Sequence, residues 1–140
     1  MGLLLRLAVF AGLGVDAFVH FHMAGDMGQN GTVSEGTLFW VQGAVAAVLA
    51  VLVLVRPRPV PYVIAFLVAA SALGAVLLYR YVDVGALGPL PDMYEPVWYT
   101  EKVVTTIAEA VATLGAALGL AYTAKRPASA AAHRGSPARV

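Results

Sequence analysis

The sequence predicts an all-α protein, an integral membrane four-helix bundle with up-down topology. Hydrophobic residues make up 60% of the 140-residue chain and charged residues only 12%, whereas soluble domains are nearer half apolar and a quarter charged. Four long apolar stretches are separated by short polar or Pro/Gly-containing connections. There is no cysteine, which excludes disulfides, thiolate metal sites and cysteine nucleophiles.

The four apolar stretches cover residues 7–24, 38–55, 62–78 and 103–124. A bilayer core about 30 Å thick requires roughly 20 helical residues, and each stretch reaches that length with its flanks. The predicted spans are residues 4–26, 35–55, 60–81 and 97–123, which together form one four-transmembrane-helix domain over residues 1–124.

The connections between the stretches are too short for anything but neighbouring antiparallel helices. Residues 25–37 are rich in Gly, Asn, Gln and Ser. In residues 55–61 every second residue from Pro57 on is a proline, and residues 83–96 contain several Gly and Pro residues. Residues 125–140 are basic and rich in Ala, Ser and Pro, and we expect them to form a disordered cytoplasmic tail.

The distribution of basic residues predicts the orientation. Most Lys and Arg residues fall before the first stretch, in the second connection or in the tail: Arg6, Arg56, Arg58, Lys125, Arg126, Arg134 and Arg139. Cytoplasmic loops carry an excess of Lys and Arg, so we expect both termini inside (N-in/C-in). The Ala/Val/Gly/Leu/Arg-rich composition is typical of a GC-rich bacterium, and we expect a multi-pass protein of the bacterial cytoplasmic (inner) membrane. The small net charge of +1 argues against nucleic acid as a partner.

Two carboxylates lie near the predicted bilayer midplane, Asp16 in the first span and Glu109 in the fourth. A charge there costs about 2.5–3.5 kcal/mol on insertion scales, so such groups face the bundle interior. At about 100° per residue, Asp16 shares a face with His20, and Glu109 shares one with Thr105, with Lys102 at its edge. If these faces meet, Asp16 lies level with Glu109, and His20 with Thr105. We call the predicted set the polar seam: Asp16, His20, Lys102, Thr105 and Glu109.

The polar seam has three interpretations. The first is structural: its bonds organise the helices of a structural or accessory membrane subunit. The second is a metal- or small-ligand-binding site, because imidazole and carboxylate groups suit zinc, iron or nickel. Its candidate ligands are Asp16, His20, His22, Glu101 and Glu109, although His20 and His22 point about 160° apart on a helix and cannot easily share one ion. The third is proton-coupled transport.

No catalytic motif is present, so we assign no enzyme activity. A transition metal is the one cofactor that the residues suggest. The expected partners are the lipid bilayer and other membrane subunits or further copies of the chain. We expect no nucleic-acid partner.

Two motifs, Val19-His20-Phe21-His22 and the segment from Tyr94 to Lys102 (YEPVWYTEK), are similar to segments of known membrane proteins. With them the chain resembles, over roughly residues 1–124, a group of small four-helix bacterial integral membrane proteins to which no activity is assigned. The overall plan is also similar to the DoxX type of small membrane protein, by architecture only, because no DoxX motif is present. The resemblance implies topology and no function.

Overall fold

The computed structural model describes residues 2–30 and 33–134, with side chains described as far as residue 125. It contains four helices: α1 (Gly2–Met23), α2 (Glu35–Val55), α3 (Pro59–Tyr81) and α4 (Thr100–Arg134). The described residues form no strand beyond one isolated bridge between Leu87 and Leu90. All four helices contain a segment long and apolar enough to cross a membrane, which confirms the predicted all-α class with four helices. Helix α4 begins at Thr100, three residues after the predicted start of the fourth span at residue 97.

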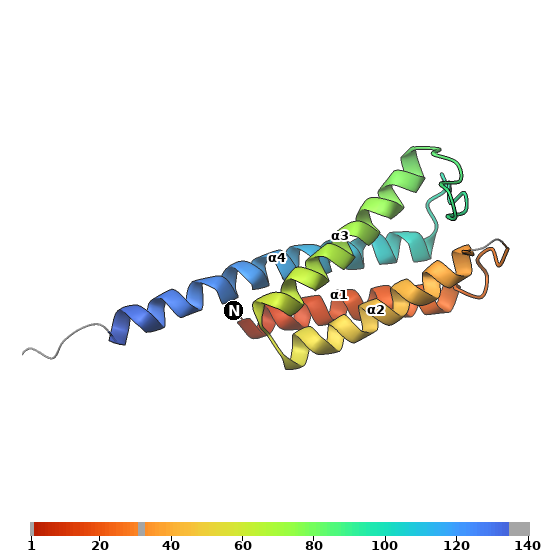
Figure 1. Cartoon of the computed structure of the whole chain (residues 1–140). Helices are drawn as coiled ribbons and strands as arrows, with labels where there is room; N and C mark the ends of the chain where they lie inside the picture. Colours follow the sequence, from red (N-terminus) through yellow and green to blue (C-terminus); the bar gives the residue numbers. More distant parts are fainter. Residues whose placement is uncertain (1, 31–32, 135–140) are drawn as a thin grey trace, which may run out of the picture.

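Consecutive helices run in opposite directions (Figure 1). Helix α1 packs closely against both α2 and α4, and α3 packs against α4. Helices α2 and α3 touch less, and α3 diverges from the other helices toward the end that carries residues 82–99 (Figure 1). We call this end, with the connections of residues 24–34 and 82–99, the loop end. The opposite end carries the start of α1, residues 56–58 between α2 and α3, and the C-terminal part of α4, and we call it the terminal end.

Small residues allow α1 and α4 to approach each other. A Cβ atom placed on Gly12 would lie 2.7 Å from the backbone oxygen of Ala108 and 2.9 Å from the backbone nitrogen of Ala112. The core near the terminal end is apolar and includes Val9, Leu13, Val53 and Tyr62, all buried, together with alanines of all four helices. Close backbone contact through small residues is the usual way in which membrane helices gain packing energy.

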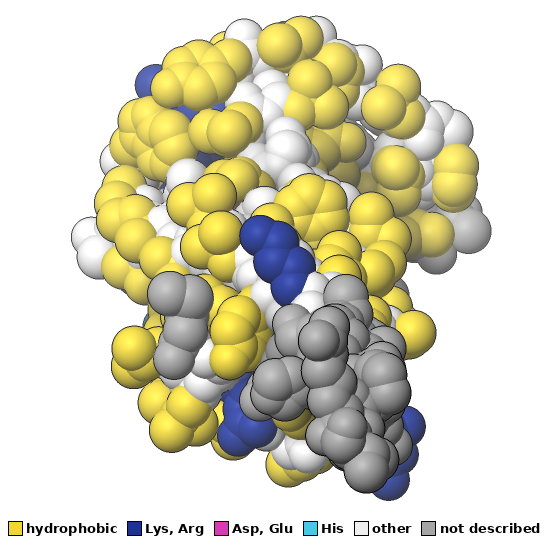
Figure 2. Space-filling model, turned by 90° about the vertical axis from the view of Figure 1, so that its left-hand side faces the viewer, with side chains coloured by type: hydrophobic (Ala, Val, Ile, Leu, Met, Phe, Trp, Pro, Cys, Tyr) yellow, Lys and Arg dark blue, Asp and Glu magenta, His cyan; other side chains and the backbone are white. Residues whose placement is uncertain are grey.

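The exterior is strongly apolar. Leu4, Phe18, Val48 and Leu114 are each at least 65% exposed, as expected for side chains that contact lipid. Figure 2, which views the molecule from the terminal end, shows a mostly hydrophobic surface interrupted by Lys and Arg side chains. No Asp or Glu is visible among the described residues on this face.

Helix α4 continues to Arg134, past Lys125, where we expected a disordered tail to begin. That residues 125–140 form a disordered tail stays a prediction. Four of the five residues 128–132 are Ala, the residue with the highest helix propensity, whereas Pro127 just before them opposes a regular helix. The apolar run of α4 ends at Ala124, directly before Lys125 and Arg126. Residues 135–140 lie outside the described residues.

Candidate functional site

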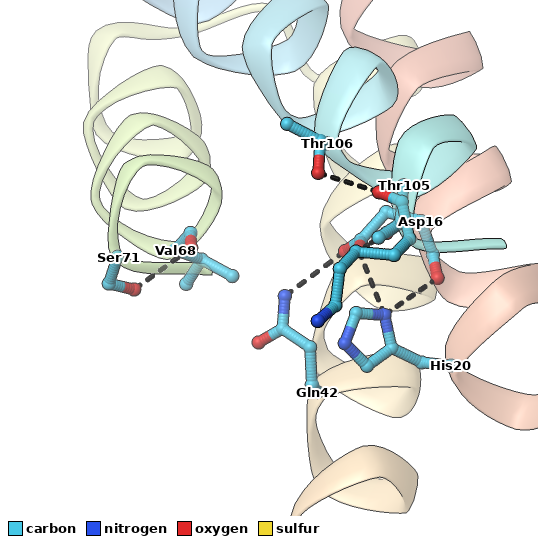
Figure 3. Close-up of polar contacts among 8 residues, drawn as sticks. Asp16, His20, Gln42, Val68, Ser71, Thr105 and Thr106 are labelled. Atoms are coloured by element: carbon cyan, nitrogen blue, oxygen red, sulfur yellow. Dashed lines mark hydrogen bonds and ion pairs between the residues drawn. The ribbon is translucent and has the colours of Figure 1, made fainter. Parts of the chain in front are cut away.

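The carboxylate of Asp16, fully buried on α1, is the centre of a hydrogen-bonded cluster. Within α1, the His20 Nδ1 atom lies 2.9 Å from both Asp16 Oδ1 and the Asp16 backbone oxygen, one helical turn away. Thr105 on α4 donates to Asp16 Oδ1 (3.1 Å), and Gln42 on α2 donates to Asp16 Oδ2 (3.0 Å). Figure 3 shows these side chains converging on Asp16 from three helices. A buried carboxylate with several donors is the satisfied form of an otherwise costly group.

Gln42 is a part of this cluster that sequence reasoning missed. The polar seam was predicted from the first and fourth spans alone, because the apolar run of residues 38–55 carries no charge. Gln42 is nevertheless the single amide in the apolar run of residues 38–55. A lone strong hydrogen-bonding group in such a run is a usable signal, because its donors and acceptor need a partner inside the bundle.

Glu109 lies beside this cluster, with its side chain within hydrogen-bonding reach of Asp16 and Thr105. The residue is 2% exposed, and among the described residues its Oε2 atom has no hydrogen-bond partner. Asp16, His20 and Glu109 each offer one potential ligand atom, and these atoms all lie within 4.8 Å of one another. Asp16 and Glu109 are thus close together, at the level expected for them. Thr105 and His20, which were expected to lie level with each other, both contact Asp16 Oδ1.

Lys102, the remaining residue of the polar seam, bonds to the 82–99 connection. It is 7% exposed, and its Nζ atom donates to the backbone oxygen of Glu95 (2.6 Å). The ammonium group also lies 5.2 Å from the centre of the Tyr99 ring, within the range of a cation–π interaction. Lys102 therefore fastens the 82–99 connection to the first turn of α4.

Two of the five candidate metal ligands lie outside the cluster. His22 is exposed and stacks on the exposed ring of Phe18, with ring centres 5.9 Å apart. Glu101 is half-buried and does not belong to the group of ligand atoms within 4.8 Å. The structure thus brings together Asp16, His20 and Glu109 only, and the two histidines diverge as their spacing predicts.

A cavity of about 690 Å³ connects this cluster with the loop end. Its deep part is lined by His20, Gln42, Thr105 and Glu109, and residues of both α2 and α3 form its walls. Toward the loop end its wall is acidic and aromatic, with the residues Asp26, Glu35, Phe39, Tyr79, Asp92, Tyr94, Glu95 and Tyr99. Met23 and Met27 also line it. Burial and then the charge of Glu95 raise the pKa of Tyr99, so its hydroxyl stays neutral at the cavity wall.

No family model, curated protein or solved structure matches this chain. The resemblance to small four-helix bacterial membrane proteins, the DoxX type included, therefore stays a prediction. The features of this protein that bear on its function are the cluster around Asp16 and the cavity that leads to it.

Proposed function

We propose that this protein is a multi-pass membrane protein with both termini in the cytoplasm, and that its cavity opens on the outer side to bind a small cation. The observation that carries the proposal is the composition of the cavity wall. Among the described residues that line it are five carboxylates, Asp26, Glu35, Asp92, Glu95 and Glu109, and one basic side chain of the Lys or Arg type, Lys102. Clefts with one sign of charge and low-dielectric walls concentrate counter-ions.

The orientation is supported by the positions of the basic residues. Arg6, Arg56, Arg58 and Lys125 lie at the terminal end, at the first turns of α1, between α2 and α3, and where the apolar part of α4 ends. The positive-inside rule then assigns this end to the cytoplasm. The loop end, into which the cavity opens, would face the outside.

The aromatic rings of the wall add to the preference for cations. Phe39, Tyr79, Tyr94 and Tyr99 line the cavity, and ring faces attract ammonium groups and other cations. Lys102 provides an internal example, since its ammonium lies over the Tyr99 ring and against a backbone oxygen. A cation from solution would find the same kinds of partner in the rest of the wall.

The cavity has the form of a binding site rather than a conduit. Its lining extends as far as Glu109, and the core side chains packed toward the terminal end, such as Val9, Leu13 and Ala112, are apolar. Its volume of about 690 Å³ lies within the range of small-molecule sites, roughly 300–1,000 Å³. These features favour binding over the proton-coupled transport that intramembrane acids also suggest.

The test uses the absence of cysteine in the natural chain. Ser71 lines the cavity halfway along α3, and its hydroxyl bonds only within its own helix, to the Val68 oxygen. In Ser71→Cys we expect the thiol to react from the outside with a membrane-impermeant methanethiosulfonate. The cationic reagent should react at least about tenfold faster than the anionic one, because a difference of 1.4 kcal/mol between their electrostatic free energies in the cavity corresponds to a factor of ten.

Two further single-cysteine variants serve as controls. Ala86→Cys, exposed in the 82–99 connection and not part of the cavity wall, corrects for the intrinsic reactivity of the two reagents. Arg58→Cys, between α2 and α3, should stay unmodified from the outside. Equal corrected rates for both reagents at Ser71→Cys would contradict the cation preference, and outside labelling of Arg58→Cys would overturn the orientation.

The bonds of Asp16 favour a second candidate function, a structural or accessory subunit whose buried polar cluster sets helix register. Asp16 accepts hydrogen bonds from α2 and α4 as well as from its own helix. This role requires no ligand, and it predicts that Ser71→Cys shows no charge preference. A partner subunit recovered with the chain in mild detergent and lost in Asp16→Leu would favour it.

A further inference from the structure

We infer that Asp16, His20 and Glu109 form a binding site for one divalent transition-metal ion at the deep end of the cavity. This inference rests on the proposed function, since the ion would enter through the cavity, and it names the class of cation. Each of the three residues offers a ligand atom, and all these atoms lie within 4.8 Å of one another. His20 and Glu109 also line the cavity and are therefore reachable from it.

The unpartnered atom of Glu109 points to a missing ligand. Its Oε2 lacks a hydrogen-bond partner among the described residues, although the residue is 98% buried. When both groups are ionised, Asp16 cannot relieve it, because an ionised carboxylate only accepts hydrogen bonds, and two neighbouring carboxylates repel each other. A divalent cation between them would supply the partner of Glu109 and balance both charges.

The contact between His20 and Asp16 is compatible with a shared ion. Nδ1 of His20 lies 2.9 Å from Asp16 Oδ1. Zinc bonds of about 2.0–2.2 Å place neighbouring ligand atoms roughly 3–3.6 Å apart. The longest distance between two of the three ligand atoms, at most 4.8 Å, would therefore have to shorten by about 1 Å when the ion binds. The ion would occupy the place of the proton between Nδ1 and Oδ1, and the imidazole would keep its proton on Nε2.

The mixture of donor types selects the class of metal. One imidazole and two carboxylates suit zinc, iron(II), cobalt(II) or nickel, whereas Mg²⁺ and Ca²⁺ prefer all-oxygen sites. Three protein ligands leave at least one coordination position for water from the cavity, as in open zinc sites. The hydrogen bonds of Gln42 and Thr105 to Asp16 would hold that carboxylate in place, as outer partners of metal ligands commonly do.

The experiment titrates the full chain, purified in mild detergent and stripped with a chelator, with Zn²⁺ alone in a calorimeter. Co²⁺ provides a second readout through its visible ligand-field bands. We expect one ion per chain, and more than a tenfold loss of affinity in Glu109→Gln and in His20→Ala, because even the loss of an outer partner commonly costs 10–100-fold. Glu109→Gln keeps the size of the side chain while removing a buried charge.

The chain provides matched controls for both residue types. His22→Ala removes the histidine that stacks on Phe18, and Glu101→Gln removes a carboxylate outside the cluster, so both should bind Zn²⁺ as the wild type does. Helical circular dichroism and thermal unfolding without metal establish that each variant is folded, and either Glu109→Gln or His20→Ala is sufficient to decide the outcome.

The metal site is overturned if the wild type binds no stoichiometric Zn²⁺, if the folded Glu109→Gln or His20→Ala variants bind it unchanged, or if His22→Ala loses it. The labelling of Ser71→Cys is measured without metal. A chain that shows the cation preference at Ser71→Cys and binds no Zn²⁺ would therefore overturn only this inference and leave the proposed cavity function standing.

Discussion

The close approach of α1 and α4 at Gly12 permits a prediction that does not depend on function. In Gly12→Ala the added methyl group would meet the Ala108 oxygen at 2.7 Å and the Ala112 nitrogen at 2.9 Å. Both are backbone atoms of α4, so the contact can be relieved only by moving one helix away from the other. Overpacking of this kind typically costs about 1–3 kcal/mol.

Gly14 in the same helix provides the matched control, because a Cβ there has no atom within 4 Å. Both Gly→Ala changes gain up to about 1 kcal/mol of helix propensity, and this gain cancels when the two variants are compared. We therefore expect Gly12→Ala to be less stable than Gly14→Ala by about 1–3 kcal/mol.

The assay is unfolding in mixed micelles with increasing sodium dodecyl sulfate, followed by circular dichroism. Because the Thr105–Asp16 bond joins the same two helices, displacement of α4 would weaken this bond as well and add to the difference. Equal free energies of unfolding for Gly12→Ala and Gly14→Ala would refute the close α1–α4 contact, and with it the placement of Glu109 beside Asp16.

Other substitutions test single contacts with the same assay. Gln42→Leu removes the bond to Asp16 from α2 and should destabilise the protein by about 0.6 kcal/mol, the average for interhelical polar bonds in a membrane, and by no more than about 1.7; a gain in stability would contradict a native Gln42–Asp16 bond. Ser34→Ala removes the side-chain cap of the Thr37 N–H at the start of α2 and should cost about 1 kcal/mol. Ser71→Ala, whose hydroxyl bonds only to Val68 within an exposed helix face, should stay within about 0.5 kcal/mol of the wild type, and a similar loss in both serine variants would argue against the cap.

The four helices follow from the sequence alone, because apolar runs of about 20 residues separated by Pro- and Gly-containing connections have few other structures available. Helical periodicity was likewise enough to place Asp16 with His20 on one face and to separate His20 from His22. The faces of α1 and α4 that carry Asp16 and Glu109 could be expected to meet, since each carboxylate needs an interior position.

The partners of these groups were decided only by the tertiary structure. The 100° period determines which residues share a face, but the rotation and height of one helix against the next depend on packing at small residues such as Gly12. That packing brings Thr105 within hydrogen-bond distance of Asp16 and adds Gln42 from the uncharged run of residues 38–55. It also leaves the Oε2 atom of Glu109 without a partner among the described residues. It also directs Lys102 to a backbone oxygen of the 82–99 connection and leaves α3 apart from α2, where the cavity lies.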